Sequence, residues 1–163
     1  LTLILAPRRL ERCAHVARII MSKGIGFVRR SDQWDKRGND FSVILLDTMG
    51  ELSEVYSICD IAFVGKSFIP PGGGHNLIEP IAEGKPVLFG SFVENNKHNA
   101  DELIKNGLGI QVNNADEIEI SAKTWLSSKD ERAKLEGRAK GFILYHQGAS
   151  QRMVNLIESQ LKN

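Results

Sequence analysis

The sequence predicts an α/β fold built as a Rossmann-like parallel sheet with helices on both faces. Short apolar runs of strand type alternate along the chain with segments whose apolar residues recur at helical spacing. Most of the runs are apolar throughout, which is typical of parallel strands that are buried on both faces. In the middle of the chain, a strand, a glycine turn, a helix and another strand follow one another as a βαβ unit.

The expected elements can be placed in order along the chain. Strands are expected at residues 1–6, 25–28, 43–46, 61–64, 86–89 and 109–112. Helices are expected at residues 10–23, 50–59, 75–83 and 98–106, and from residue 116 onward with breaks near 127 and at 137–148. Gly24 and Gly84 follow two of these helices and are expected to end them. Segments 29–40 and 91–97 are expected to be loops, the first with Trp34 as its only large apolar residue.

Length and composition restrict the class of protein. The 163 residues correspond to about one domain. Lys and Arg number 21 and Asp and Glu number 20, so a net charge of +1 gives no field that would attract nucleic acid or an anionic membrane. No apolar run approaches the roughly 18 residues of a membrane span, so we expect a soluble chain. Cys13 and Cys59 are interpreted as small core residues in a reducing compartment. The chain opens inside a strand without an initiator Met, which suggests a piece of a longer protein.

The glycine turn before residue 75 is the strongest candidate for a ligand site. Its three glycines, Gly72–Gly73–Gly74, lie between a strand and a helix, so free backbone N–H groups at a positive helix end could bind a phosphate. Asn76 and Glu79 are three residues apart and lie on the same side of this helix. The Glu79 carboxylate could therefore accept hydrogen bonds from ribose hydroxyls. His75 is interpreted as a capping or packing residue.

Two further loops follow predicted strands and extend the candidate site. Pro7 and Arg8 follow the first strand, where the guanidinium could bind a phosphate. Residues 47–51 follow the third strand, and Gly50 would let the backbone approach a nucleobase. Asp47 and Thr48 are also typical helix caps. Because ligands bind at the carboxyl ends of parallel strands, we expect the three loops to converge. The sequence contains no metal-ligand or Walker motif.

These motifs together resemble the C-terminal half of the 3-deoxy-D-manno-octulosonic acid (Kdo) transferases, over nearly the whole chain and in the same order. The matching motifs are Ala6-Pro7-Arg8 with Glu11-Arg12, Asp47-Thr48-Met49-Gly50-Glu51-Leu52, Ala62-Phe63-Val64-Gly65, Gly73-Gly74-His75-Asn76-Leu77-Ile78-Glu79-Pro80 and Gly84-Lys85-Pro86-Val87. The resemblance implies the C-terminal half of a GT-B glycosyltransferase, with residues 1–163 as a single donor-nucleotide-binding domain. It further implies that CMP is contacted by Pro7, Arg8, Met49, Gly50, Glu51, Asn76, Leu77, Ile78 and Glu79, and that its phosphate lies on Gly73, Gly74 and His75.

The resemblance also implies an activity. The family transfers Kdo from CMP-Kdo to a lipid A precursor in lipopolysaccharide biosynthesis, at the cytoplasmic face of the Gram-negative inner membrane, with no metal and no other cofactor. Its general base, its membrane contact and most of its acceptor site belong to an N-terminal domain that is absent from this chain. We therefore expect no catalytic residue within the chain and no sugar transfer by the chain alone.

Two alternatives fit the same residues. A UDP-sugar transferase or a non-hydrolysing UDP-sugar epimerase shares the glycine turn and the glutamate. A non-catalytic nucleotide-binding or docking module would also show a nucleotide-type fold.

Overall fold

The computed structural model describes residues 1–32, 41–148, 153–154, 157 and 159–160. The chain divides into two compact units, Leu1–Leu52 and Ser53–Asn163, and each is described by itself. All strand pairing is parallel, and it forms two sheets of three strands, one in each unit. The parallel α/β architecture expected from the sequence is thereby confirmed.

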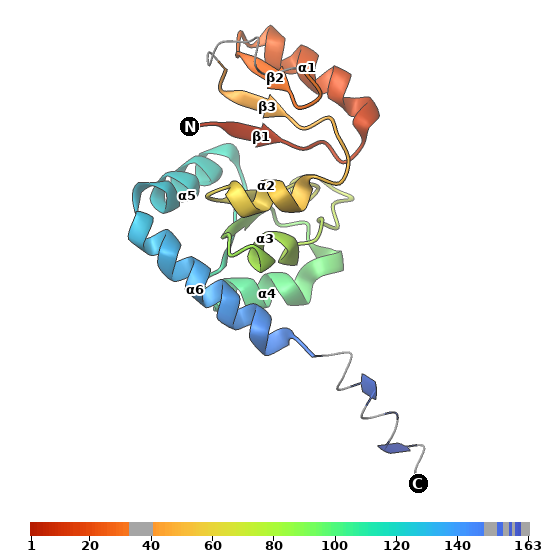
Figure 1. Ribbon diagram of the computed structural model, residues 1–163, viewed down its shortest axis with the longest axis vertical. Helices are drawn as coiled ribbons and strands as arrows, with labels where there is room; N and C mark the ends of the chain where they lie inside the picture. The colour runs from red at the N-terminus through yellow and green to blue at the C-terminus, as the bar shows by residue number, and fades with distance from the viewer. Residues whose placement is uncertain (33–40, 149–152, 155–156, 158, 161–163) are drawn as a thin grey trace. The chain divides into compact units, whose positions relative to one another are not determined.

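The first unit has strand order β1-β3-β2, so β3 is the central strand (Figure 1). Its elements are β1 (Leu3–Leu5), a 3-10 helix (Leu10–Arg12), α1 (Cys13–Ser22), β2 (Phe27–Arg29) and β3 (Val43–Leu45). Leu5, Leu45 and Arg29 lie in register at the ends of the three strands. The loops that follow these strands therefore start at one edge of the sheet. Cys13 and Ala17 of α1 pack on Leu45 and form the small core of the unit.

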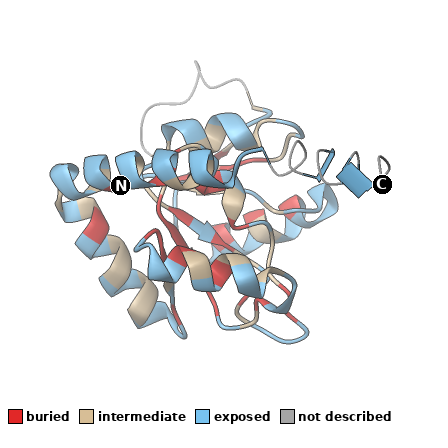
Figure 2. Ribbon diagram, turned by 90° about the horizontal axis from the view of Figure 1, so that it is seen from below, coloured by how far each residue is buried: buried red, intermediate tan, exposed pale blue. Residues whose placement is uncertain are grey.

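The second unit has strand order β4-β5-β6, and each pair of neighbouring strands is joined through a helix. Its elements are α2 (Leu52–Ile58, which starts at the unit boundary), β4 (Ala62–Val64), α3 (Ile78–Ala82), β5 (Val87–Phe89), a 3-10 helix (Glu94–Asn96), α4 (Lys97–Lys105), β6 (Gly109–Gln111), α5 (Ala115–Ser127) and α6 (Lys129–His146). Every residue of β5 is buried. Figure 2 shows exposed residues on the outer turns of the helices and buried residues toward the interior. Ile81 of α3, Leu103 of α4 and Leu135 of α6 belong to the same core.

All six predicted strands are present, but two predicted helices differ from the structure. The helix expected at residues 75–83 begins only at Ile78, because the preceding residues form the end of the glycine turn. The break expected at residues 137–148 is wrong, since α6 runs to His146 through Gly137 and Gly141. Glycine costs a helix about 1 kcal/mol, and burial of Leu135 and Ala139 in the core offsets that cost.

Other sequence predictions concern single residues. Gly24 and Gly84 follow helices with φ of +66° and +76°, as expected of helix ends. Both cysteines are free, with Cys13 buried and Cys59 half-buried. Trp34 and most of the segment expected as a loop at 29–40 lie outside the described residues. Within the described part of the chain, no helix has the length and apolar character needed to cross a membrane.

Candidate functional site

Three loops start at the carboxyl edge of the sheet in the first unit. The loop after β1 carries Pro7 and Arg8, and the loop after β3 carries residues 47–51, so the structure brings two of the predicted segments to one edge. The loop after β2, which holds Arg30 and Ser31, starts at the same edge; it was predicted as a loop but not as part of the site. A carboxyl edge of this kind is where parallel sheets bind ligands.

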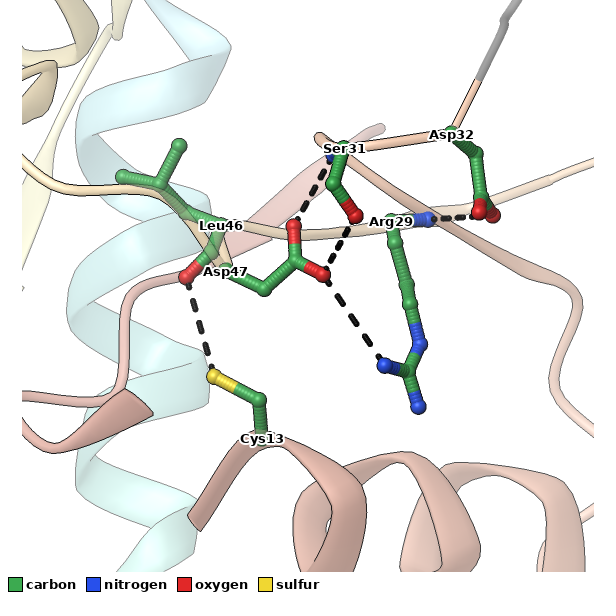
Figure 3. Close-up of polar contacts among 6 residues, drawn as sticks. All are labelled: Cys13, Arg29, Ser31, Asp32, Leu46 and Asp47. Atoms are coloured by element: carbon green, nitrogen blue, oxygen red, sulfur yellow. Dashed lines mark hydrogen bonds and ion pairs between the residues drawn. The ribbon is translucent and has the colours of Figure 1, made fainter. Parts of the chain in front are cut away.

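Asp47 joins two of these loops (Figure 3). Its carboxylate accepts hydrogen bonds from the Ser31 backbone N–H at 2.9 Å and from the Ser31 hydroxyl at 2.7 Å, and Arg29 lies 3.9 Å away. Partial burial works to raise the pKa of Asp47, but the two hydrogen bonds and the Arg29 charge outweigh it, so this pKa lies below its ordinary value. Asp47, which the sequence suggested as a helix cap, thus holds the loop after β2 against the loop after β3.

Glu51 makes a second link to the loop after β2. The Arg30 guanidinium lies 2.7 Å from the Glu51 carboxylate. The pKa of Glu51 is lowered by the nearby Thr48 hydroxyl and by Arg30, although no hydrogen bond of good geometry forms at that hydroxyl. Gly50 lies between Asp47 and Glu51 in the sequence. Its φ is +88°, and a Cβ added there would meet open space. The backbone at Gly50 is therefore accessible to a ligand.

The glycine turn in the second unit does not present the free backbone N–H groups that the sequence predicted. All three turn amides donate within the protein: Gly72 and Gly74 bond to carbonyls of the preceding loop, and the Gly73 N–H bonds to the Glu94 carboxylate at 3.2 Å. The expectation that these three amides are free is wrong, because the loop after β4 folds on itself at Gly72 and Gly74, and the segment after β5 folds back on Gly73. Asn96 of that segment also donates to the Gly73 carbonyl, at 3.3 Å.

Ser67 fixes the loop after β4 from inside. It is fully buried, and its hydroxyl donates to the Val64 carbonyl at 2.7 Å and accepts from the Gly90 N–H at 2.8 Å. The Phe92 N–H donates to the Ser67 carbonyl at 2.9 Å. A Cβ at Gly90 would collide with this carbonyl oxygen. Around Ser67, the loops after β4 and β5 are consequently held together by backbone groups and one hydroxyl.

Asn76 and Glu79 are brought together as the sequence predicted. The Asn76 side-chain amide donates to the Glu79 carboxylate at 3.1 Å, and its carbonyl oxygen accepts from the Ile78 N–H at 3.0 Å. Asn76 therefore orients Glu79, whose side chain is exposed. Leu77 is fully buried, so neither its side chain nor its backbone is exposed to a ligand.

Tyr56 of α2 is a neighbour of Glu79 that the sequence did not reveal. Burial raises the pKa of the Tyr56 phenol, and the Glu79 charge raises it further. A tyrosine at helical spacing in an amphipathic segment is indistinguishable from a core residue, so the sequence held no signal for this proximity. No group of three or more potential metal ligands occurs among the described residues.

Comparison with known proteins places the chain in a family. The family model described as "Glycosyl transferases group 1" matches residues 15–142. The chain belongs to the group 1 glycosyl transferases. The expected fold, the C-terminal Rossmann-like half of a GT-B enzyme, agrees with this membership.

Relatives of this glycosyl transferase chain, and a similar solved structure of another protein, carry more specific names. A 3-deoxy-D-manno-octulosonic acid transferase of Haemophilus influenzae is 36% identical over 163 residues, and one of Chlamydia trachomatis serovar D is 30% identical over 155 residues. These alignments cover 99% and 95% of this chain but 38% and 35% of the relatives, so the chain spans little more than a third of their length. The crystal structure of the C-terminal CMP-Kdo binding domain of WaaA from Acinetobacter baumannii matches with a TM-score of 0.78 and 28% identity, over 87% of this chain and 73% of that one.

Proposed function

We propose that this chain is the donor-binding part of a Kdo transferase and that it holds CMP-Kdo. The observation that carries the proposal is the structural match to a domain described as CMP-Kdo binding, with a TM-score of 0.78 over 87% of this chain. The match at 28% identity is supported by relatives that are named Kdo transferases. The candidate loops also have the chemistry that a nucleotide requires.

The proposal assigns a task to each loop. Arg8 and Pro7 contact the phosphate side of CMP, and the accessible backbone at Gly50, flanked by Met49 and Glu51, reads the cytosine edge. Glu79, oriented by Asn76, accepts hydrogen bonds from the ribose hydroxyls. The backbone of Gly73, Gly74, His75 and Ile78 approaches the phosphate, and the fully buried Leu77 anchors this segment in the core. Because Gly73 already donates to Glu94, a phosphate that binds this amide must displace that carboxylate.

The chemistry divides between this chain and the rest of the enzyme. An inverting sugar transfer needs a base on the acceptor hydroxyl and stabilisation of the departing phosphate. The loops described here can stabilise the departing CMP. We expect the base, the lipid A precursor site and the contact with the inner membrane to come from a domain outside these 163 residues, so the chain alone transfers no sugar. No cofactor is required.

Calorimetric titration of the chain with CMP and with UMP tests the proposal. We expect CMP to bind more tightly than UMP, because the two bases differ in the donor and acceptor groups of their edges. Arg8→Ala and Glu79→Ala should each weaken CMP binding about tenfold, as expected when a charged hydrogen-bonding group is lost. Arg18→Ala, at an exposed position on α1, is the matched control and should leave binding unchanged. Tighter binding of UMP would favour a UDP-sugar enzyme, and equal affinity for the two nucleotides would favour a less specific nucleotide module.

A further inference from the structure

Lys66, in the loop after β4, has an unusual backbone conformation. Its φ is +59°, and among the described residues every other positive φ belongs to a glycine. The left-handed region is disfavoured for a residue with a Cβ, because the side chain approaches the following carbonyl oxygen. Such strain persists where the surroundings fix it, and it is concentrated at functional sites.

The surroundings of Lys66 do fix this conformation. The Lys66 carbonyl accepts a hydrogen bond from the Gly74 N–H at 3.0 Å, which ties it to the glycine turn. The next residue, Ser67, is fully buried and bonded to Val64 and Gly90. A glycine at position 66 would meet the same backbone requirements with less strain. The loop geometry therefore does not require a lysine at this position, and the charged side chain is what distinguishes Lys66 from a glycine there.

The charges of the turn suggest what this side chain does. The Lys66 side chain is exposed, and no ion pair joins it to another residue in the described part of the chain. Glu94 places a carboxylate on the Gly73 N–H of the same turn. A phosphate that approaches this turn meets the negative charge of Glu94, and a cation on the turn would offset that repulsion.

We propose that the Lys66 ammonium binds the phosphate of the nucleotide donor and so favours ligands that carry this phosphate over ligands that lack it. This inference rests on the proposed function and adds a residue to its site. The ammonium group is a compact charge with three N–H donors on a flexible stem, so it can follow a phosphate that shifts as its bond to the sugar breaks. The strained backbone at Lys66 keeps the base of this stem on the turn that the phosphate approaches.

Three variants of the chain separate the charge of Lys66 from its backbone strain. Lys66→Met keeps the strain and removes the charge, Lys66→Gly removes both, and Lys66→Arg keeps both. We expect the dissociation constant of CMP to rise about tenfold in the Met and Gly variants, and to change less than about threefold in the Arg variant. Cytidine, which lacks the phosphate, should bind all four proteins equally. The thermal midpoint of Lys66→Gly should equal or exceed that of the unmodified chain, so weaker binding cannot be attributed to a weaker fold.

Each alternative outcome identifies which idea fails. If the Met and Gly variants bind CMP as tightly as the unmodified chain, or if they lose cytidine binding to the same degree, the role of Lys66 is wrong and the proposed function stands. Loss of CMP binding in Lys66→Gly alone would indicate a role of the backbone and would also overturn the inference. An unmodified chain that binds neither CMP nor cytidine would overturn the proposed function, and this inference with it.

Discussion

The loops of the two units are fixed by different chemistry, although both follow the carboxyl ends of parallel strands. In the first unit, the carboxylates of Asp47 and Glu51 are held by Ser31, Arg29 and Arg30 from a neighbouring loop. In the second unit, the corresponding contacts are made mostly by backbone groups and by the neutral Ser67 hydroxyl. The first arrangement must respond to pH and salt, whereas the second depends on the space between two backbone segments.

The largest expected effect comes from filling that space in the second unit. Gly90→Ala places a Cβ against the Ser67 carbonyl oxygen and should lower the free energy of unfolding by about 3 kcal/mol. Gly50→Ala in the first unit meets open space, so only its φ of +88° opposes the change, and the loss should be about 1 kcal/mol. Urea unfolding monitored by the fluorescence of Trp125, in a Trp34→Phe background, measures the effect of Gly90→Ala. Amide hydrogen exchange of β3 measures the effect of Gly50→Ala. Equal losses would mean that the second unit tolerates expansion.

A smaller effect, which depends on pH, distinguishes the charged loop contacts of the first unit from the neutral contacts around Ser67 in the second. Asp47→Asn should cost the first unit about 1–2 kcal/mol near pH 7, because it removes a charge that accepts two hydrogen bonds. The pKa of Asp47 is lowered in the folded state, so this contribution is complete above the ordinary value of 3.8 and is lost as the pH falls through the lower folded pKa. Hydrogen exchange of the β3 amides at several pH values would show the difference between variant and parent disappearing in acid.

The matched change in the second unit is Ser67→Ala. It leaves the Gly90 N–H without its acceptor and should cost about 1–3 kcal/mol, with no dependence on pH in the acid range because the hydroxyl does not titrate there. A pH-dependent loss for Ser67→Ala, or a constant one for Asp47→Asn, would contradict the distinction between the two units.

The smallest expected effect concerns the Glu94 carboxylate, which bonds to the glycine turn. Glu94→Ala frees the Gly73 N–H and removes a negative charge, so CMP should bind about threefold more tightly at low salt. Asn96→Ala removes the other side-chain contact with Gly73 without changing the charge, and it serves as the control. Weaker binding of CMP by Glu94→Ala would show that Glu94 positions the turn for the ligand and does not compete with it.

The fold could be predicted from the sequence because its signals are local. Apolar runs marked all six strands, and Gly24 and Gly84 marked helix ends because their backbone conformation favours glycine. The start of α3 and the length of α6 were mispredicted. In both cases tertiary contacts, which no local pattern reports, outweighed the propensity of individual residues.

The candidate site was predictable only where neighbouring residues in the sequence make it. Asn76 and Glu79 are three positions apart, and their hydrogen bond follows from that spacing. Contacts across 16 to 21 residues were not foreseeable: Ser31 with Asp47, Arg30 with Glu51, and Gly73 with Glu94. These contacts depend on which strands lie side by side, and the apolar pattern of the sequence does not predict the order of the strands in a sheet. It stays a prediction that the loops of both units bind one nucleotide.

Amide NMR spectra of the chain, recorded during titration with CMP, test the central claim most directly. The account predicts that the signals of Arg8, Gly50 and residues 73–79 shift together with one dissociation constant, while those of exposed α5 residues stay in place. It also predicts smaller shifts with UMP at the same concentration. Shifts that are confined to one unit, or that leave Gly50 and Glu79 unmoved at saturating CMP, would contradict the claim that these loops bind a single nucleotide.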